Sequence, residues 1–345
     1  MVRGMKAAVI KDRSTIQLID LPIPRFDNNE LLVRMRACGV CGTDLEKVRG
    51  EQITPPVLGH EVAGEIEEVG KDITQFTRGD RVVVHHHISC RSCFYCKNAL
   101  ETLCEAFPNS NLDPCGFAEF FRVPRTLVAG GTVYRLPDEL SFEEGTLVEP
   151  TACCIRALRK SGIKPGSSVA VFGTGPVGLL HMQLLKLHGA APTYGVDILE
   201  SRRRAAMRLG ATSALDPTTE NIEKTLREGT DDQGVDHAIV ATGSTKAFEQ
   251  ACKSVRKGGT VTLFGAPARG ASVSLDISNL FLREITFRSS YSTSETEMRI
   301  ALDLIAHKRI EASQLITHKL PLREVNEAFH LAMDGEKAVK VVVTS

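Results

Sequence analysis

Ser168-Val-Ala-Val-Phe-Gly173-Thr-Gly175-Pro-Val-Gly178 combines a short apolar run with three glycines in the spacing G-x-G-x-x-G. The run predicts a buried strand, and the residues after the second glycine predict an apolar helix. Gly173 permits the tight turn, Gly175 lets the backbone approach a pyrophosphate, and Gly178 lets the helix pack closely on the strand. The helix N-terminus adds unpaired N–H groups and the positive end of its dipole. The stretch therefore predicts the phosphate-binding turn of a dinucleotide site.

A second predicted strand, Thr193-Tyr-Gly-Val, ends at Asp197, which follows Gly173 by 24 residues. A carboxylate there can accept hydrogen bonds from both ribose hydroxyls of an adenosine, and its charge would repel the 2′-phosphate of NADP. We therefore predict NAD as the cofactor, with NADP less favoured. The basic run 202–204 could soften this preference, which makes Arg202 a candidate cofactor contact; the alternative is the solvated first turn of a helix. The predicted cofactor loop also includes Pro176 and Val177.

Strand and helix patterns alternate on both sides of this motif. Helical patterns cover 179–187 and 202–209, and apolar strands are predicted at 237–240 and 260–264. Such alternation predicts a doubly wound parallel sheet with helices on both faces. Residues 152–292 are therefore predicted to form the dinucleotide-binding domain.

The N-terminal part of the chain has a different pattern. Short β-like runs such as 7–10 and 31–36 alternate with turns rich in glycine, proline and aspartate, which predicts an irregular β domain. Ser141 and Glu144, three residues apart, form a capping box that predicts the start of a linking helix.

The end of the chain is predicted to rejoin this first domain. An amphipathic helix is expected at 298–306 and a closing strand at 339–343. The predicted domains are therefore 1–151 together with 293–345, and 152–292.

Charge and apolar runs restrict the partners of the chain. Lysine plus arginine and aspartate plus glutamate number 42 each, so small molecules are favoured as partners over nucleic acid or an anionic membrane. No apolar run approaches the roughly twenty residues that a membrane-spanning helix needs. Met1–Lys6 leads into a predicted strand rather than a signal peptide. A cytoplasmic protein is therefore predicted.

Four of the ten cysteines are clustered, at Cys90, Cys93, Cys96 and Cys104. Three thiols at a repeat of three, with a fourth further on, can place four sulfurs around one tetrahedral zinc and leave no position for substrate. Two disulfides are the alternative, but a reducing compartment favours metal. We therefore predict a structural zinc site.

Further candidate metal ligands are spread along the first predicted domain. Cys41-Gly-Thr-Asp44 is followed by Gly59-His-Glu61, and Glu149-Pro150 precedes the second domain. Together with the four cysteines and the glycine motif, these stretches stand in the order found in zinc-dependent medium-chain dehydrogenases. The chain resembles this family, which includes alcohol, sorbitol and threonine dehydrogenases, over essentially its whole length.

The resemblance implies a fold, a metal site and an assembly. It implies an α/β chain with a GroES-like β-rich catalytic domain and a Rossmann domain, assembled as a homodimer or homotetramer. Cys41 and His60 are implied to bind a catalytic zinc, with Glu61 and Glu149 competing for the remaining protein position. Zinc held by thiolate, imidazole and carboxylate keeps one position open for an alcohol oxygen, whose pKa it lowers. Two zinc ions per chain are therefore expected.

Proton transfer is expected to begin at Thr43, because a hydroxyl two residues past a zinc ligand can bond the substrate oxygen. Many relatives have a histidine five residues after the cysteine ligand, but this chain has Glu46. The glutamate could accept the proton, lie on the surface while water completes the path, or contact a polar substrate.

Three other features of the sequence invite a functional interpretation. Cys38 forms a C-x₂-C pair with Cys41, but we interpret it as a packing residue. The run His85-His-His87 is interpreted as a solvated or cleft-lining strand rather than a metal site. Arg156 is either a surface residue of a helix or a contact for a substrate carboxylate or phosphate.

The resemblance also implies cofactor contacts in weaker motifs. Backbone near the ends of two predicted strands would line the nicotinamide, two serines would bond its carboxamide, and a lysine would approach the pyrophosphate, with a solvated edge strand as the alternative for the lysine. These residues are Thr242, Phe264, Ala266, Ser290, Ser292 and Lys340.

The function that this pattern predicts is NAD-linked oxidation of a secondary alcohol, with a polyol or sugar derivative favoured over a long apolar alcohol. Threonine is the second candidate substrate, and an aldose oxidised at its first carbon is the third. A non-catalytic NAD-binding or redox-sensing protein is an alternative of a different class, which loss of Cys41, His60 or Thr43 would have favoured.

Overall fold

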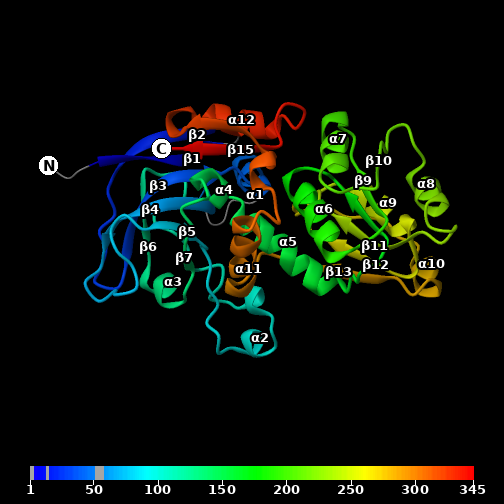
Figure 1. The fold of residues 1–345 in the computed structure, drawn as a ribbon, viewed down its shortest axis with the longest axis horizontal. Coiled ribbons are helices and arrows are strands. Elements are labelled where there is room, and N and C mark those ends of the chain that lie inside the picture. The colour runs from blue at the N-terminus through cyan, green and yellow to red at the C-terminus, as the bar shows by residue number, and fades with distance from the viewer. Residues whose placement is uncertain (1–3, 13–14, 51–57) are drawn as a thin grey trace. The chain divides into compact units, whose positions relative to one another are not determined.

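The computed structural model describes residues 4–12, 15–50 and 58–345 of the chain (Figure 1). These residues divide into two compact units, Met1–Ala152 with Thr293–Ser345, and Cys153–Ser292. Part of the predicted start of the chain, Met1–Arg3, lies outside the described residues. Within the described residues, no helix is both long enough and apolar enough to span a bilayer.

The unit Cys153–Ser292 is built on one parallel sheet. Its strand order is β10-β9-β8-β11-β12-β13, and every neighbouring pair is parallel. Numbered along the chain this order is 3-2-1-4-5-6, the doubly wound Rossmann arrangement, and it places the switch point between β8 and β11. The strands are β8 (Val169–Phe172), β9 (Thr193–Val196), β10 (Ser213–Leu215), β11 (Val235–Val240), β12 (Val255–Leu263) and β13 (Thr286–Ser289).

Helices connect these strands because each parallel crossover must return to the same end of the sheet. The apolar helix that follows the glycine motif packs on β8 and β9, and its N-terminus faces the carboxyl end of β8. The helices are α6 (Pro176–His188), α7 (Glu200–Arg208), α8 (Ile222–Glu228), α9 (Thr245–Ser254) and α10 (Ile277–Leu282).

The other unit contains a mixed sheet in the order β14-β15-β3-β4-β5-β7, with β6 also paired to β3, and a separate hairpin of β1 and β2. Buried aliphatic and aromatic side chains form its core between these strands and α12. The strands are β1 (Gly4–Asp12), β2 (Thr15–Pro22), β3 (Leu31–Gly39), β4 (Glu61–Val69), β5 (Arg81–Val84), β6 (Phe120–Val123), β7 (Val133–Arg135), β14 (Ile316–Pro321) and β15 (Lys340–Thr344).

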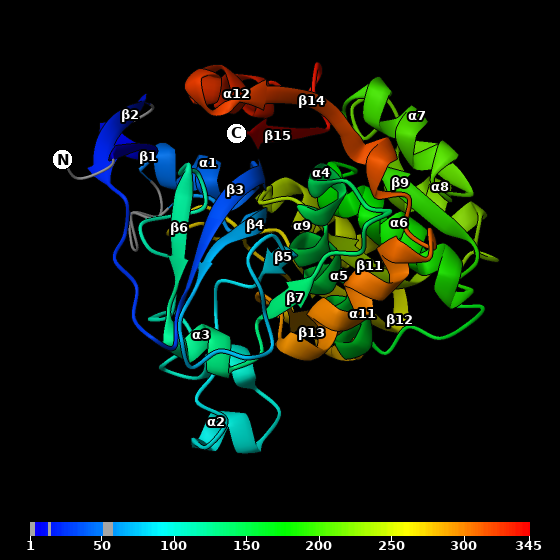
Figure 2. The same cartoon turned by 60° about the vertical axis from the view of Figure 1, so that its left-hand side comes forward.

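Short helices of this unit lie in the connections between strands. Figure 2 shows α12 beside β14 and β15, and both Figures 1 and 2 show α2 projecting away from the sheet of its own unit. The helices are α1 (Gly42–Val48), α2 (Phe94–Lys97), α3 (Arg125–Ala129), α4 (Phe142–Gly145), α11 (Glu295–Ala306) and α12 (Val325–Met333), with 3₁₀ turns at Glu101–Leu103, Ala312–Leu315 and Leu322–Glu324.

The predicted linking helix is present as two helices. Ser141 and Glu144 form the predicted capping box, since each accepts a hydrogen bond from the backbone N–H of the other, at 3.1 and 3.0 Å. This helix, α4, ends at Gly145, where the hydroxyl of Thr146 donates to the carbonyl of Glu143 at 2.7 Å. A new helix, α5 (Val148–Ser161), then starts one residue before Glu149. The predicted start of the linking helix is therefore confirmed, and the link consists of two helices in place of one.

Candidate active site and metal centres

The antiparallel pairing of β3 and β4 brings the first set of candidate ligands together. Gly39 at the end of β3 lies opposite Glu61 at the start of β4. The residues just beyond this pair are Cys41, at the N-cap of α1, and His60. The ligand atoms of Cys41, His60 and Glu61 all lie within 4.8 Å of one another. Thiolate, imidazole and carboxylate are donors that zinc accepts, and this set leaves room for a further ligand.

Asp44 accepts hydrogen bonds from both of the loops that carry these ligands. Its Oδ2 accepts the backbone N–H of Cys41 at 3.1 Å, and its Oδ1 accepts that of Gly59 at 2.9 Å. The same Oδ1 lies 3.5 Å from Nδ1 of His60, which leaves Nε2 of the ring to bind a metal. The sequence motif contains Asp44, but its role had not been predicted. The signal was a carboxylate three residues after a candidate cysteine ligand, at the third position of a helix.

The charges of His60 and Asp44 shift their pKa values in opposite directions. Burial by itself would lower the pKa of His60, but the nearby Asp44 and Cys41 raise that pKa well above the ordinary histidine value. Burial also opposes ionisation of Asp44, but the charge of His60 and the hydrogen bonds from His60 and Gly59 lower the pKa of Asp44. The metal-free pair therefore favours imidazolium beside carboxylate.

Lys340 lies in the same cluster as Glu61. Its Nζ donates to the carbonyl of Val40 at 3.0 Å and forms an ion pair with Oε2 of Glu61. A Cβ on Gly39 would lie 2.1 Å from that oxygen, so only glycine leaves space for the pair. The alternative of a solvated edge-strand lysine is wrong, because β15 lies between β14 and β3 and the lysine is 3% exposed.

The two predicted proton-transfer residues both lie on α1. Thr43 and Glu46 are half-buried, and their spacing of three residues places them on one side of the helix. Glu46 forms an ion pair with Arg49, with 3.4 Å between Oε1 of the glutamate and a guanidinium nitrogen.

Glu149 belongs to a second group of ligand-type side chains. Its carboxylate and the rings of His85 and His86 offer ligand atoms within 4.8 Å of one another. The strand expected at His85–His87 is not present, because β5 ends at Val84. The solvated alternative is wrong, because the three histidines are 0, 8 and 8% exposed, and the cleft-lining alternative stays a prediction. Burial, together with the charge of His87, lowers the pKa of His85 to about 3 and that of His86 well below the ordinary value.

Two other expectations concern single side chains. Cys38 is completely buried, and burial raises the pKa of its thiol well above the ordinary value, as expected for a packing residue. Arg156 is only 6% exposed, so the alternative of a surface residue on its helix is wrong.

The four clustered cysteines have the spacing that a tetrahedral zinc requires. Their sulfurs lie within 4.8 Å of one another, and Cys96 is 3.5 Å from Cys93 and 4.0 Å from Cys90. Zinc–sulfur bonds of about 2.3 Å place tetrahedral sulfurs about 3.8 Å apart. All four are free thiols, so the alternative of two disulfides is not present. Hydrogen bonds from Ser92 and from the backbone of Cys93 lower the pKa of Cys90 to about 6.

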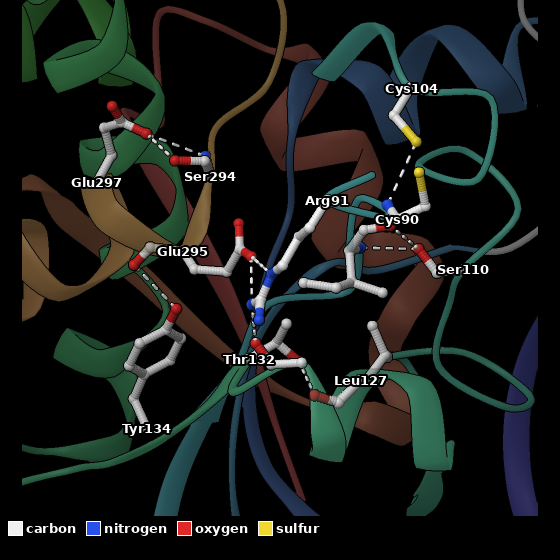
Figure 3. Close-up of polar contacts among 12 residues, drawn as sticks. Cys90, Arg91, Cys104, Ser110, Leu127, Thr132, Tyr134, Ser294, Glu295 and Glu297 are labelled. Carbon is white, nitrogen blue, oxygen red and sulfur yellow. Dashed lines mark hydrogen bonds and ion pairs between the residues drawn. The ribbon is translucent and has the colours of Figure 1, made fainter. Parts of the chain in front are cut away.

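The cysteine lobe is attached to the returning part of the chain through Arg91 (Figure 3). The guanidinium Nε of Arg91 donates to the carboxylate of Glu295 at 3.1 Å, and a terminal nitrogen bonds the carbonyl of Gly130. The hydroxyl of Tyr134 donates to the backbone carbonyl of Glu295 at 3.1 Å. Glu295 begins α11, so these contacts join the lobe to the start of that helix.

The predicted cofactor turn has the local geometry that its glycines require. Gly173 has a φ of +90°, which side chains disfavour. A Cβ on Gly178 would lie 2.0 Å from the carbonyl oxygen of Gly173, so helix and turn can meet only at glycine. Gly175 is the N-cap of α6, followed by Pro176 at the first helical position and then Val177. A Cβ on Gly175 would meet only the guanidinium of Arg202, at 3.6 Å.

Asp197 lies beside this turn, after the end of β9. Its carboxylate accepts the backbone N–H groups of Thr174 at 2.7 Å and Leu199 at 2.9 Å. Arg202 lies 3.9 Å from the same carboxylate, and its side chain is 22% exposed. The side chain of Arg203 is 17% exposed and pairs with Asp216 at 2.9 Å. Arg202 and Arg203 are therefore partly buried, whereas the side chain of Arg204 is 65% exposed, so the alternative of a solvated helix turn holds for only part of the run.

The remaining predicted cofactor residues follow three neighbouring strands. Thr242 comes two residues after β11, and Phe264 comes directly after β12, where its N–H donates to the carbonyl of Val240 at 3.0 Å. Ala266 is two residues further on. Ser290 follows β13 and is 8% exposed, and Ser292 has a φ of +57°. All five follow the carboxyl ends of strands in the parallel sheet, where such sheets bind their ligands.

Comparisons with known proteins agree with both units. The family model of the alcohol dehydrogenase GroES-like domain matches residues 27–138, and that of the zinc-binding dehydrogenases matches residues 176–307. Sorbitol dehydrogenase of Bacillus subtilis is 30% identical over 99% of this chain and 97% of its own. The chain belongs to the zinc-dependent medium-chain dehydrogenases. The predicted combination of a GroES-like domain and a Rossmann domain is thereby confirmed.

Two further relatives extend the comparison. D-arabitol-phosphate dehydrogenase of Enterococcus avium is 32% identical over 95% of this chain and 93% of its own. A zinc-binding dehydrogenase of Sinorhizobium meliloti, solved with NADP bound, superimposes with a TM-score of 0.89 at 30% identity, covering 99% of this chain and 100% of that one. The protein is therefore an alcohol dehydrogenase-type oxidoreductase of a family that uses zinc and NAD(P).

Proposed function

We propose that this dehydrogenase oxidises a secondary alcohol of a polyol or sugar derivative to a ketone, reversibly and with NAD. The observation that carries the proposal is the group of Cys41, His60 and Glu61, whose ligand atoms lie within 4.8 Å of one another. Zinc supplies the Lewis acidity that lowers the pKa of the alcohol, and NAD accepts the hydride. The residues of the chain hold both groups, take up the proton and orient the substrate.

Cys41, His60 and Glu61 are proposed as the ligands of the catalytic zinc. Glu61 has two carboxylate oxygens, so one can pair with Lys340 while the other binds metal. Asp44 acts through His60, because its carboxylate fixes the tautomer that leaves Nε2 of the ring for the metal. Four thiolates from Cys90, Cys93, Cys96 and Cys104 are proposed to hold the structural zinc.

Thr43 is proposed to accept the proton of the substrate hydroxyl. Thr43 comes two residues after the ligand Cys41, and this spacing is expected to place its hydroxyl near the proposed zinc. Glu46 lies one helical turn further along α1 and is proposed to take the proton onward. Its carboxylate forms an ion pair with Arg49, and the side chains of Glu46 and Arg49 are 22% and 44% exposed.

A hydroxylated substrate is proposed because of the relatives and the side chains near the zinc group. The relatives named above act on sorbitol and on a phosphorylated arabitol by their names. Near His60 this chain has His86, with 5.0 Å between the two ring centroids, and His86 lies beside Glu149. Such polar groups suit a substrate with neighbouring hydroxyls better than an apolar alcohol, which would leave them unpaired.

NAD is proposed as the preferred cofactor. The turn of Gly173, Gly175 and Gly178 would take the pyrophosphate, and Asp197 would take the adenosine ribose. The buried carboxylate of Asp197 disfavours a phosphate beside it. Arg202 lies next to that carboxylate and is proposed to contact the cofactor. NAD is therefore expected to bind more tightly than NADP, without complete exclusion of NADP.

The chain is proposed to assemble as a homodimer or a homotetramer built from such dimers. The edge strand β13 is exposed along its whole length. Beside it, α10 presents Ile277 and Phe281 with 77% and 79% of their surface exposed. An open sheet edge next to an exposed apolar face is typical of a protein interface, and β13 can pair antiparallel with its copy about a two-fold axis.

A cytoplasmic location is proposed from the chemistry of the cysteines. The four thiols of the lobe and the thiol of Cys41 must stay reduced to bind zinc, and all five are free. A reducing compartment keeps them in that form.

The proposed function is tested by measuring NAD reduction with a panel of polyols, aldoses and threonine. Turnover of one or more polyols, lost in Cys41→Ala while the four-cysteine zinc is retained, is the expected result. Turnover of threonine or of aldoses alone would replace the substrate class. Absence of NAD reduction with every substrate of the panel, while NADH still binds, would favour a non-catalytic NAD-binding protein.

A further inference from the structure

A group of basic and hydroxyl side chains lies at the end of β13, inside the unit Cys153–Ser292. The Nζ of Lys160, in the last turn of α5, donates to the carbonyl of Ser289 at 3.1 Å. Arg288 and Ser290 flank Ser289 in the chain, and Thr262 of β12 pairs with Arg288 in the parallel register. Residues from one helix and two neighbouring strands therefore meet at one place.

The polar side chains of β12 and β13 lie on the same face of the parallel sheet. Side chains alternate between faces along a strand, so Arg288 and Ser290 lie opposite to Phe287. Ser290 continues the ladder, because its N–H donates to a carbonyl of β12 at 3.1 Å. Phe287 contacts Phe248 of α9, with 5.9 Å between the ring centroids, so α9 covers the other face. Thr262, in register with Arg288, therefore shares the face of Arg288 and Ser290.

Two hydroxyl groups of this face have no hydrogen-bond partner in the part of the chain that the structure describes. They belong to Thr262 and Ser290, which are 1% and 8% exposed. A buried hydroxyl without a partner is costly, and a ligand that accepts hydrogen bonds from both hydroxyls would remove that cost. The hydroxyls therefore indicate a ligand with several acceptor oxygens.

The positive charges beside these hydroxyls are not neutralised by acidic side chains. Within residues 4–12, 15–50 and 58–345, neither Lys160 nor Arg288 forms an ion pair. Burial, and then the charges of Arg156 and Arg288, lower the pKa of Lys160. An anion between these groups would offset the repulsion of the like charges. Arg288 is exposed and Lys160 is half-buried, so an anion can enter from solvent.

We propose that Lys160, Arg288, Thr262 and Ser290 bind a phosphate group. The guanidinium presents its N–H donors in a fork that matches phosphate oxygens, and the ammonium adds a second charged donor. The two hydroxyls donate to the same group. A phosphate ester has three terminal oxygens for these donors, whereas a carboxylate has two, so the donor set favours phosphate.

The position of this phosphate site relates it to the reacting end of the cofactor. Ser290 is one of the two serines expected at the nicotinamide carboxamide, whereas Asp197 is expected at the adenosine ribose. A phosphate bound at Ser290 therefore lies at the nicotinamide end, where the substrate reacts. The same chemistry serves the phosphate of a phosphorylated polyol and a free phosphate ion. Use of the site for a substrate rests on the proposed function, but phosphate binding does not.

Calorimetric titration of the zinc-loaded, full-length protein with inorganic phosphate tests the site. Saturating NADH is present, so that the glycine turn is occupied. Binding of one phosphate per chain is expected. Lys160→Met/Arg288→Gln should weaken it about tenfold or more, because two charge-assisted hydrogen bonds are lost.

Lys253→Met/Arg208→Gln is the matched control, since it removes the same two charges from exposed positions on α9 and α7. This control should bind phosphate as the wild type does. Absence of saturable binding to the wild type, or equal affinity in the Lys160→Met/Arg288→Gln variant, would overturn the proposal.

A single substitution tests the site even if the double variant fails to fold. Thr262→Val removes the unpaired hydroxyl and nearly keeps the shape, so the melting temperature without phosphate should not fall. Phosphate should raise the melting temperature of the wild type, and should raise that of Thr262→Val by less. An equal rise in both proteins would overturn the proposal.

Turnover distinguishes a substrate phosphate from a free one. In a buffer without phosphate, kcat/KM is measured for polyols and for their phosphate esters. If the substrate carries the phosphate, the ratio of ester to polyol should fall about tenfold in Lys160→Met/Arg288→Gln and stay constant in the control. A ratio that the variant leaves unchanged, with calorimetric binding as expected, assigns the site to free phosphate. If no polyol or ester is oxidised while phosphate still binds through Lys160 and Arg288, the proposed function fails and the phosphate site is supported.

Discussion

At the scale of single residues, Asp44 is the side chain on which the proposed zinc group most depends. It bonds the backbone of both ligand loops and the ring of His60. In Asp44→Asn the shape is kept and the charge is lost, so we expect zinc at the Cys41 group to bind about 10- to 100-fold more weakly. Zinc retained against a graded series of chelators measures this effect.

The cysteine lobe is an internal control for that measurement, because its zinc should be unaffected. Asp80→Asn is the matched variant: Asp80 caps a turn by accepting the N–H of Thr77 at 2.7 Å, away from the zinc group. Equal zinc retention in wild type, Asp44→Asn and Asp80→Asn would contradict the role given to Asp44.

The pKa of His60 predicts a pH dependence whose sign differs between the metal-free and the zinc-loaded protein. Asp44 raises this pKa in the metal-free chain despite burial. Below that pKa the charged pair stabilises the metal-free fold, and this contribution is lost as the pH rises through it. Zinc needs the neutral ring, so zinc affinity should fall as the pH drops through the same range, which starts above about 6.5.

Two measurements check this prediction across pH 6 to 9, chosen to bracket about 6.5. The melting temperature of the metal-free protein should decrease with rising pH, and competition with a chelator should show zinc affinity increasing. Asp44→Asn should move the midpoint of the zinc curve to lower pH. Identical curves for both proteins would show that Asp44 does not control the titration.

Two glycines of the cofactor turn should respond differently to alanine. A Cβ on Gly178 would meet the carbonyl of Gly173 at 2.0 Å, whereas one on Gly175 meets only Arg202 at 3.6 Å. We expect Gly178→Ala to lower the free energy of unfolding by about 3 kcal/mol or more. Gly175→Ala should change that free energy by less than about 1 kcal/mol. It should nevertheless weaken NADH binding about tenfold, because its methyl group occupies pyrophosphate space.

Chemical denaturation and NADH fluorescence titration measure the two effects separately. Equal losses of stability in Gly175→Ala and Gly178→Ala would contradict the different roles assigned to these glycines.

At the scale of elements, short sequence patterns predicted the structures that depend on residues close together in the chain. The strand, turn and helix at 169–188 follow from three glycines and an apolar run, and the capping box of Ser141 and Glu144 forms as its spacing requires. The burial of His85 and Lys340 depends on segments distant in the chain. Lys340 becomes an inner-strand residue only because β15 pairs with β3, some three hundred residues earlier. No local pattern carries that information.

The exposed face of α10 and β13 predicts a dimer that charge should disrupt. Ile277→Asp/Phe281→Asp places two carboxylates on the apolar face. In the wild type, Ile277 is 77% exposed and Phe281 is 79% exposed. We expect the mass in solution to fall from dimer to monomer, because burying unpaired carboxylates is costly. Light scattering after gel filtration measures the mass.

Met207→Asp is the matched control, since Met207 is 47% exposed on α7 and is not part of this face. It should leave the mass unchanged. A double variant of wild-type mass would show that the dimer, if present, uses another surface.

At the scale of the whole molecule, the first unit needs both ends of the chain. Arg91 bonds Glu295, and Glu61 pairs with Lys340, so segments on either side of Cys153–Ser292 hold each other. The cofactor unit, by contrast, is one continuous segment. This segment contains the glycine turn, Asp197 and the residues that directly follow β11 and β12.

This division predicts that metal removal separates turnover from cofactor binding. Every proposed zinc ligand lies in Met1–Ala152, whereas Gly173–Gly178 and Asp197 lie in Cys153–Ser292. After chelation, turnover should fall to background, while the Kd for NADH stays within about twofold, because independent sites contribute additively. Zinc readdition should restore turnover. A parallel loss of NADH affinity would show instead that cofactor binding depends on the metal-holding unit, and the two units would then have to be treated as one cooperative site.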